Sequence, residues 1–196
     1  MADISIQGLN NPDTRVILLS AFTTFAVLLA FVAYCVGKIK CRHFRMVIKS
    51  YFVFERLQYF RNEAKFFYYL RQLDPFLFEE LILTALKKGG HKIIRNKRYT
   101  GDGGIDGRVL IKDSTGKKQL YFIQAKRYQG HITKQHVESL NWLCHKHKVQ
   151  GLFVHTGKTG KGSWSACSHR LTMISGNQLI LLLRDPAKWH PRKKQG

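Results

Sequence analysis

The longest uncharged stretch of this chain restricts its fold more than any other feature. It runs from Val16 to Gly37 and reads VILLSAFTTFAVLLAFVAYCVG. As a helix rising ~1.5 Å per residue it would be about 33 Å long, enough to cross a hydrocarbon core of about 30 Å. A buried helix of a globular domain is typically shorter and amphipathic. The stretch therefore predicts a transmembrane helix over residues 16–37, preceded by an extracytoplasmic tail of residues 1–15.

A cleavable signal peptide is the alternative for this stretch. It is disfavoured because the stretch is too long, its leading segment lacks a cationic cluster, and no small-x-small cleavage site follows. One cation, Arg15, precedes the span. Six follow it within twenty residues: Lys38, Lys40, Arg42, Arg45, Lys49 and Arg56. The positive-inside rule then predicts a single-pass protein of the inner (cytoplasmic) membrane, with the N-terminus outside and the C-terminal part in the cytoplasm.

Residues 38–73 form a basic and aromatic segment without Pro or Gly. Apolar residues such as Phe44, Val47, Ile48 and Tyr51 recur at helical intervals, which predicts a stem of one or two helices. The stem either lies on an anionic lipid surface or packs on the domain that follows, and the sequence leaves both open. Its aromatic residues exceed what a solvated linker would contain, so we expect something to bury them.

The formal net charge of +21 over 196 residues is the main compositional feature. Such an excess attracts polyanions and gains affinity from counterion release, which makes DNA and anionic lipid the expected partners. A merely solvated basic face is the alternative for any single cation. The candidate contacts to DNA phosphates are Lys92, Arg95, Lys97, Arg98, Arg127, Lys158 and Lys161.

A glycine-rich turn and a later Gln-Ala-Lys sequence form the most informative motif. The turn GDGGIDG occupies residues 101–107, and an apolar run ends in Gln124 and Lys126. This spacing can bring Asp106, Gln124 and Lys126 together on two adjacent strands, with the last two on one face because strand side chains alternate. A carboxylate and an amide oxygen suit a hard cation such as Mg²⁺, and an ammonium can orient water or neutralise developing charge.

The helix upstream of the turn supplies the fourth candidate. Phe78-Glu79-Glu80-Leu81 lies on that helix, and an acidic residue of this segment is expected to reach the cation or its waters. Glu80 is expected to be a solvated neighbour. The four residues together are typical of metal-assisted phosphodiester hydrolysis.

Other interpretations of these residues are weaker. The turn alone fits an ordinary hairpin. Asp102, Asp106, Gly107 and Asp113 match positions of a calcium-binding EF-hand loop, but strand-like flanks replace its helices and the bidentate glutamate is missing. Zinc ligands are present without the regular paired spacing of a zinc site: Cys144, His145, His147, Cys167 and His169.

Residues from about Asp74 to about Leu183 resemble the Mrr-like restriction endonucleases, a branch of the PD-(D/E)xK nuclease superfamily. The resemblance lies in Pro75 with Phe78-Glu79-Glu80-Leu81, in the turn at 101–107, in Gln124-Ala125-Lys126-Arg127 and in Gly151-Leu152-Phe153-Val154-His155-Thr156. It implies an α/β fold with a mixed sheet flanked by helices, a divalent metal (Mg²⁺ or Mn²⁺) and cleavage of double-stranded DNA. The implied active-site positions are Glu79, Asp106, Gln124 and Lys126. Glutamine in place of the usual acidic residue is an Mrr-type variant that lowers the site's negative charge.

Local signals place the elements of this domain. Asp74 can cap a helix that begins at Pro75 and stops at Gly89-Gly90. Strands are predicted near 91–96, 105–111, 119–126, 149–155 and 171–174, and further helices near 133–146 and 162–170. The expected divisions are a nuclease domain over 74–186 and a basic tail over 187–196.

The sequence thus favours a membrane-tethered, metal-dependent DNA endonuclease, in the restriction or processing of DNA. A homodimer is expected by analogy, because cutting both strands generally needs two active centres. Two alternatives stay open: a catalytically silent DNA-binding module that keeps the nuclease fold, and a membrane-bound interaction protein.

Overall fold

The structure is a computed structural model, and it describes residues 12–96, 104–112 and 116–191. The chain forms two units, Met1–Arg45 and Met46–Gly196. Helix α1, Pro12–Leu57, contributes to both. The two candidate contacts Lys97 and Arg98, the aspartates Asp102 and Asp113, and much of the glycine-rich turn lie outside the described residues.

The first unit contains the apolar part of α1. Over the 20 residues Val16–Cys35 the helix is long and apolar enough to cross a membrane, and none of this stretch is buried. The hydroxyls of Ser20 and Thr24 donate to the carbonyl oxygens of Ile17 and Ser20, each at 2.8 Å. These polar groups are therefore satisfied within the helix, as an apolar environment requires.

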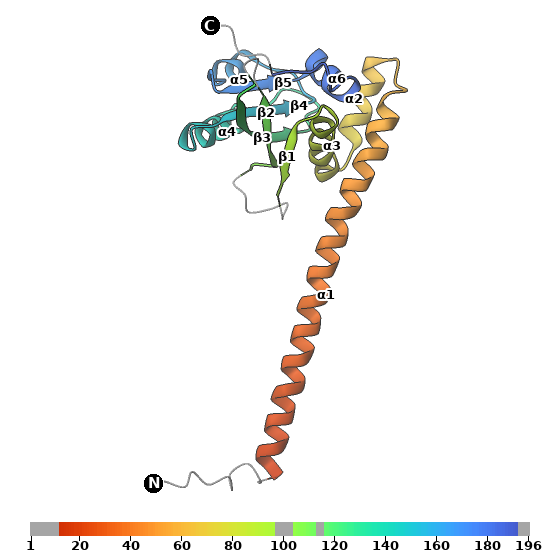
Figure 1. Ribbon diagram of the computed structural model, residues 1–196, viewed down its shortest axis with the longest axis vertical. Coiled ribbons are helices and arrows are strands. Elements are labelled where there is room, and N and C mark those ends of the chain that lie inside the picture. Colours follow the sequence, from red (N-terminus) through yellow and green to blue (C-terminus); the bar gives the residue numbers. More distant parts are fainter. Residues whose placement is uncertain (1–11, 97–103, 113–115, 192–196) are drawn as a thin grey trace. The chain divides into compact units, whose positions relative to one another are not determined.

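The second unit is a mixed α/β domain (Figure 1). Its elements after α1 are α2 Glu63–Gln72, α3 Pro75–Lys88, β1 Lys92–Arg95, β2 Gly107–Lys112, β3 Lys118–Lys126, α4 Lys134–Lys146, β4 Gln150–His155, α5 Lys161–Ser165, β5 Leu171–Ile174 and α6 Gly176–Arg184. The five strands follow the order β1-β2-β3-β4-β5. Strands β1 to β3 pair antiparallel, and β3 to β5 pair parallel. This confirms the mixed sheet and the order of elements expected from the sequence.

The helix α3 begins and ends where its local signals predict. The Asp74 carboxylate accepts from the backbone N–H of Phe76 at 2.9 Å and of Leu77 at 3.4 Å, and Pro75 is the first helical residue. At the other end Gly89 is the C-cap, followed by Gly90 with a φ of 83°. Glycine adopts this left-handed conformation without the steric cost of a Cβ, so the chain can turn into β1.

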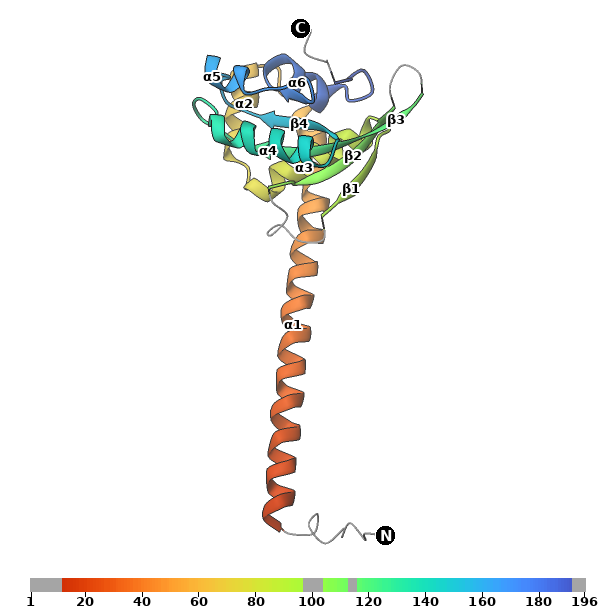
Figure 2. The same ribbon diagram turned by 90° about the vertical axis from the view of Figure 1, so that its left-hand side faces the viewer.

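Helices cover both faces of the sheet (Figure 2). The core on one face joins α3 and α6 to strand residues such as Val109, Ile123 and Val154. The core on the other face joins α4 to Phe122 and Phe153, which directly precede Ile123 and Val154 in their strands. Because successive strand residues point to opposite faces, the two cores show to which face the side chains within β3 and β4 are directed.

The larger core includes the stem predicted from the sequence. Val53, Phe54 and Leu57 of α1, and Phe66 and Leu70 of α2, are all buried in it. The Arg184 guanidinium lies over the Phe66 ring at 5.2 Å. Of the two possibilities left open for residues 38–73, the structure thus supports packing on the following domain for the part from Met46 onward.

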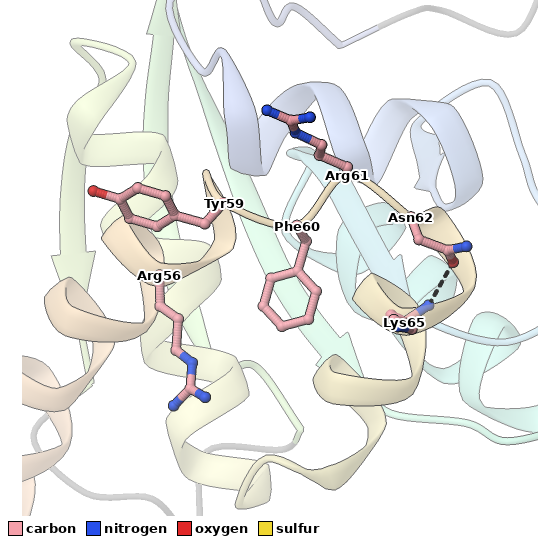
Figure 3. Close-up of a pocket in the computed structure, with 6 residues that line it drawn as sticks. All are labelled: Arg56, Tyr59, Phe60, Arg61, Asn62 and Lys65. Atoms are coloured by element: carbon pink, nitrogen blue, oxygen red, sulfur yellow. Dashed lines mark hydrogen bonds between the residues drawn. The ribbon is translucent and has the colours of Figure 1, made fainter.

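The turn between α1 and α2 forms a hollow of about 410 Å³ (Figure 3). Its lining is rich in cations and aromatic residues: Arg56, Tyr59, Phe60, Arg61, Asn62 and Lys65. Asn62 caps α2 by accepting from the backbone N–H of Lys65 at 3.0 Å. In the close-up the Arg56 and Arg61 guanidiniums point away from each other, so the hollow does not assemble its cations around one point.

Candidate active site

The turn that precedes β2 places Asp106 against β3. The Asp106 backbone N–H donates at 2.8 Å to the carbonyl oxygen of Ile123, which is the register partner of the next residue, Gly107. The Asp106 carboxylate accepts from the backbone N–H of Ala125 at 2.7 Å. Ala125 is the middle residue of the Gln124-Ala125-Lys126 segment. The carboxylate therefore lies at this segment, as predicted.

Gln124 lies beneath the same turn. A Cβ built on Gly104 would come within 2.9 Å of the Gln124 Nε2 atom, and Gly104 has a φ of 86°. A side chain at this position would therefore suffer both backbone strain and contact with Gln124, which explains the glycine. Gln124 is only 5% exposed, and its Oε1 atom is buried without a hydrogen-bond partner among the described residues.

A buried amide oxygen without a partner usually has a structural or chemical reason. The Asp106 carboxylate accepts from the backbone N–H of Ala125, the residue after Gln124, so a carboxylate and an amide oxygen belong to the same end of β3. Oxygens of these two kinds suit a hard divalent cation. The described residues contain no group of three or more His, Cys, Asp or Glu side chains arranged for a metal. A cation at this point would therefore rely on the amide oxygen and on water as well as on carboxylate.

Lys126 and His155 are partners across the parallel β3–β4 pair. Gln124, Lys126 and His155 share the face of Phe122 and Phe153 by strand alternation. His155 is fully buried, and burial lowers its pKa to about 4, so the imidazole is neutral at pH 7. Its Nε2 atom is 3.2 Å from the Thr159 hydroxyl. Sequence inspection singled out the strand that ends at His155 but gave this residue no role.

The four predicted active-site residues do not all come from one side of the sheet. Asp106, Gln124 and Lys126 lie at the same end of the β2–β3 pair, whereas Glu79 is a half-buried residue of α3. That helix packs on the opposite face, where Phe78 and Leu81 enter the larger core. The position of Glu79 relative to a metal thus stays a prediction.

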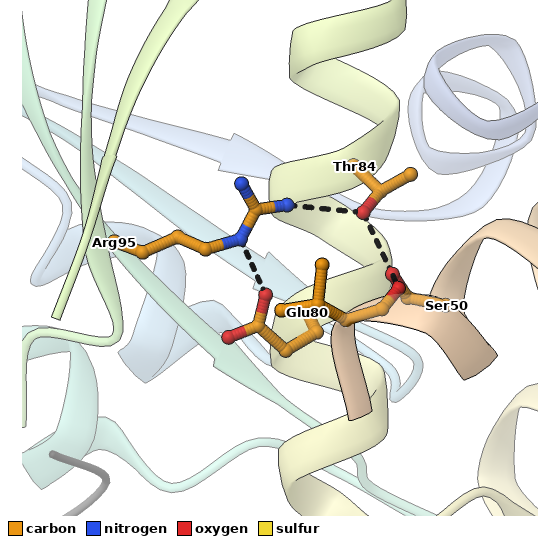
Figure 4. A network of polar contacts seen from close by, with 5 residues as sticks. Ser50, Glu80, Thr84 and Arg95 are labelled. Atoms are coloured by element: carbon orange, nitrogen blue, oxygen red, sulfur yellow. Dashed lines mark hydrogen bonds and ion pairs between the residues drawn. The ribbon is translucent and has the colours of Figure 1, made fainter. Parts of the chain in front are cut away.

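The expectation that Glu80 is solvated is wrong. Its side chain is 3% exposed, and its Oε2 atom forms an ion pair with the Arg95 Nε atom at 2.7 Å (Figure 4). Arg95 also donates to the Thr84 hydroxyl at 3.3 Å. The guanidinium assigned from the sequence to DNA is therefore occupied inside the protein. Burial of the glutamate is tolerated because the ion pair compensates its charge.

A second cation from the predicted DNA contacts is also engaged internally. Arg127 donates from Nη1 to the carbonyl oxygen of Arg71 at 2.6 Å. Arg71 in turn donates to the carbonyl oxygen of Thr156 at 2.7 Å, next to His155. These bonds tie the end of α2 to the strand ends of the site. Of the candidate DNA contacts that the structure describes, Lys92, Lys158 and Lys161 are exposed to solvent.

The zinc interpretation has little structural support. Cys144 and Cys167 are both buried, and burial raises the pKa of the Cys144 thiol to about 11. A thiol with so high a pKa is a poor metal ligand at neutral pH because binding needs the thiolate. Cys167 donates to the carbonyl oxygen of Leu171 at 3.0 Å, as a packed core residue does.

Comparisons with known proteins agree with this geometry. The family model Mrr_cat, described as restriction endonuclease, matches residues 70–183, which is more than half of the chain. No curated protein matches, and no solved structure matches. The matched range contains every candidate active-site residue. With a mixed five-stranded sheet flanked by helices and a site at the ends of β2 and β3, the chain belongs to the Mrr-type restriction endonuclease family and contains a nuclease domain of the restriction-endonuclease type.

Proposed function

We propose that this protein is a membrane-tethered endonuclease that uses a divalent metal to hydrolyse DNA phosphodiester bonds. The observation that supports it most is the position of the Asp106 carboxylate on the Ala125 N–H, between Gln124 and Lys126. Three chemically different groups, a carboxylate, an amide oxygen and an ammonium, thereby belong to one strand end.

Asp106 and Gln124 are the proposed protein ligands of Mg²⁺ or Mn²⁺, and Glu79 is proposed to act on its bound waters. The unpartnered Oε1 atom of Gln124 fits this role. When bound, such an ion polarises the phosphoryl group and makes its bound water more acidic. One carboxylate and one neutral amide attract a cation less than two carboxylates do, so we expect modest metal affinity.

Lys126 is proposed to orient the attacking water or to neutralise charge that develops on the phosphate. Its neighbour His155 is neutral at pH 7, so it neither repels the ammonium nor adds a second positive charge. Exposed Lys92, Lys158 and Lys161 are proposed to hold the DNA backbone. Contacts of this kind are independent of sequence and weaken with salt.

Nicking of supercoiled plasmid by the detergent-solubilised full chain tests this function. Asp106→Asn and Lys126→Ala should each slow Mg²⁺-dependent nicking by at least about 100-fold, because the first removes a proposed metal ligand and the second removes the ammonium proposed to act at the phosphate. Asp185→Asn and Lys188→Ala are matched controls, since they break an exposed ion pair of 2.6 Å and should leave the rate unchanged. Equal nicking by all variants would contradict the assignment. Metal-independent DNA binding without cleavage by the wild type would instead support the silent module.

The membrane anchor is the second part of the proposal. The exposed apolar stretch Val16–Cys35 supports a span, and the cations that follow it support a cytoplasmic nuclease domain. We expect the protein to stay in the membrane fraction after carbonate washing. In spheroplasts, external protease should remove an N-terminal epitope and leave a C-terminal one. Loss of the N-terminal epitope from the mature protein before protease is added would identify a cleaved signal sequence instead.

The products of cleavage report on assembly. We propose a homodimer on double-stranded DNA, because each active site hydrolyses one strand. Linear product formed without a nicked intermediate would support two coordinated sites. Accumulation of nicked circles would support a monomer.

A further inference from the structure

A buried polar chain connects α1 to the β1–β2 pair (Figure 4). The Ser50 hydroxyl of α1 is 2.7 Å from the Thr84 hydroxyl of α3, and both residues are fully buried. Thr84 accepts from Arg95, which pairs with Glu80. We call Ser50, Glu80, Thr84 and Arg95 the clamp. Apolar residues of similar volume often stabilise a core as well as a buried ion pair does, so stability alone does not explain the clamp.

The β1 end of the clamp holds the residues on either side of Asp106. Arg95 is the register partner of Gly107 in the β1–β2 pair. The next residue, Asn96, donates from Nδ2 to the carbonyl oxygen of Ile105, and its Oδ1 atom accepts from Arg108 at 3.2 Å. Both neighbours of Asp106 in sequence are therefore fastened to the end of β1. The orientation of its carboxylate depends on where that end lies.

Helix α3 touches the same turn directly. A Cβ built on Gly107 would come within 2.7 Å of a Leu83 methyl carbon, so helix and turn are in close contact at this glycine. Leu83 precedes Thr84 of the clamp. Any shift of α3 along the sheet would therefore move both the side chain above Gly107 and the hydroxyl that holds Arg95. Packed interiors transmit such shifts because they have little free volume.

We propose that Arg95 is a positioning residue for Asp106. We also propose that Ser50, through Thr84, makes the position of Arg95 depend on the last turns of α1. The clamp fixes the end of β1, β1 fixes the turn, and the turn presents the carboxylate to the Gln-Ala-Lys segment. This inference rests on the proposed metal-binding role of Asp106. Ser50 lies outside the residues that match the family, so the match assigns it no role.

The test measures Mn²⁺ affinity of the full chain without DNA, by electron paramagnetic resonance of the free ion, beside kcat and KM for plasmid nicking. Arg95→Lys keeps a positive charge for Glu80 but lacks the fork that reaches Glu80 and Thr84 together. We expect it to lower Mn²⁺ affinity and kcat about 10-fold, as changes to residues behind metal ligands do. Ser50→Ala, which keeps the ion pair intact, should lower both about 3-fold. DNA affinity in EDTA should stay within about twofold of wild type for both.

Glu55→Gln is the matched control. Glu55 also joins α1 to α3, through an ion pair of 3.1 Å with Lys88, but both side chains are largely exposed. This variant should keep wild-type Mn²⁺ affinity. If it weakens Mn²⁺ binding as much as Ser50→Ala does, a general loosening of the helices explains the effect and the proposal is wrong.

Two further outcomes would overturn the inference. Weaker DNA binding by Arg95→Lys in EDTA, with normal Mn²⁺ affinity, would show that Arg95 contacts DNA instead of positioning Asp106. Lower melting temperatures for both variants with unchanged kcat and Mn²⁺ affinity would make the clamp purely structural.

Asp106→Asn separates this inference from the proposed function. Wild-type metal binding and nicking by Asp106→Asn would remove both, whereas an inactive Asp106→Asn beside a normal Arg95→Lys would remove the positioning role alone.

Discussion

A fragment that begins at Asp74 should fail to fold, whereas a fragment that begins at Met46 should fold. The shorter fragment lacks Val53, Phe54, Leu57, Phe66 and Leu70, which are buried in the larger core. Burial of one such side chain stabilises a protein by about 1.5–3 kcal/mol, so the loss is on the order of 10 kcal/mol. The net stability of a domain is only about 5–15 kcal/mol. The remaining apolar surface of α3 and α6 would also be exposed to water.

Circular dichroism during heating distinguishes the two fragments. The fragment from Met46 should melt cooperatively, and the one from Asp74 should aggregate or show no transition. Within the longer fragment, Leu57→Ala should cost about 2–5 kcal/mol because Leu57 is fully buried. Phe52→Ala, on the same helix but 71% exposed, should change the free energy of unfolding by less than about 0.5 kcal/mol. A cooperative transition of equal midpoint in both fragments would contradict the shared core.

Acidification should destabilise the nuclease domain through His155. Burial lowers the pKa of His155 to about 4 in the folded state, against 6.5 for the ordinary group. Between these values the unfolded chain binds a proton that the folded protein excludes, so stability falls as pH drops from about 6.5 to about 4. Above pH 6.5 the contribution is fully present. The difference amounts to about 3 kcal/mol. Charged and titratable neighbours are Lys126 on β3 and Tyr128, whose ring lies 6.5 Å away.

Urea unfolding at pH 7.5 and pH 4.5 measures this effect. His155→Gln removes the titrating group and should shrink the difference in unfolding free energy between the two pH values by about 2.5 kcal/mol. The pH dependence of His155→Gln must be compared with that of the wild type, because a second histidine also contributes to it. Burial and the nearby His190 lower the pKa of His91 as well. His145→Gln, an exposed histidine of α4, should leave the pH dependence unchanged. An unaltered pH dependence in His155→Gln would show that this imidazole accepts a proton in the folded protein.

Local signals in the sequence predicted the elements correctly where the chemistry is local. The Asp74 carboxylate, the proline after it and the two glycines after Lys88 act on their own helix, so their effect needs no other part of the chain. The same holds for the alternation that puts Gln124 and Lys126 on one face. Asp106 was placed against this segment because an antiparallel pair joined by a short connection has little choice of register.

The sequence could not show that Glu80 is buried, or that Arg95 and Arg127 differ from the many other cations by bonding inside the protein. Adjacent helix residues with identical side chains differ only in how the helix is rotated against the sheet. That rotation is set by Phe78, Leu81 and Leu83, which pack into a core built from distant strands. In a chain of net charge +21, the sequence does not distinguish an arginine that pairs with a buried glutamate from one that binds a phosphate.

The sequence by itself determined the apolar segment, the class of fold, and the strand that brings Gln124 and Lys126 to a glycine-rich turn. Each of these depends on residue types at short separation, where backbone geometry leaves few choices. The tertiary structure alone decided that the stem belongs to the nuclease core, that Glu80 and Arg95 pair in the interior, and that His155 lies buried beside Lys126. These facts depend on contacts between residues far apart in the chain, and burial is a property of the whole packed domain.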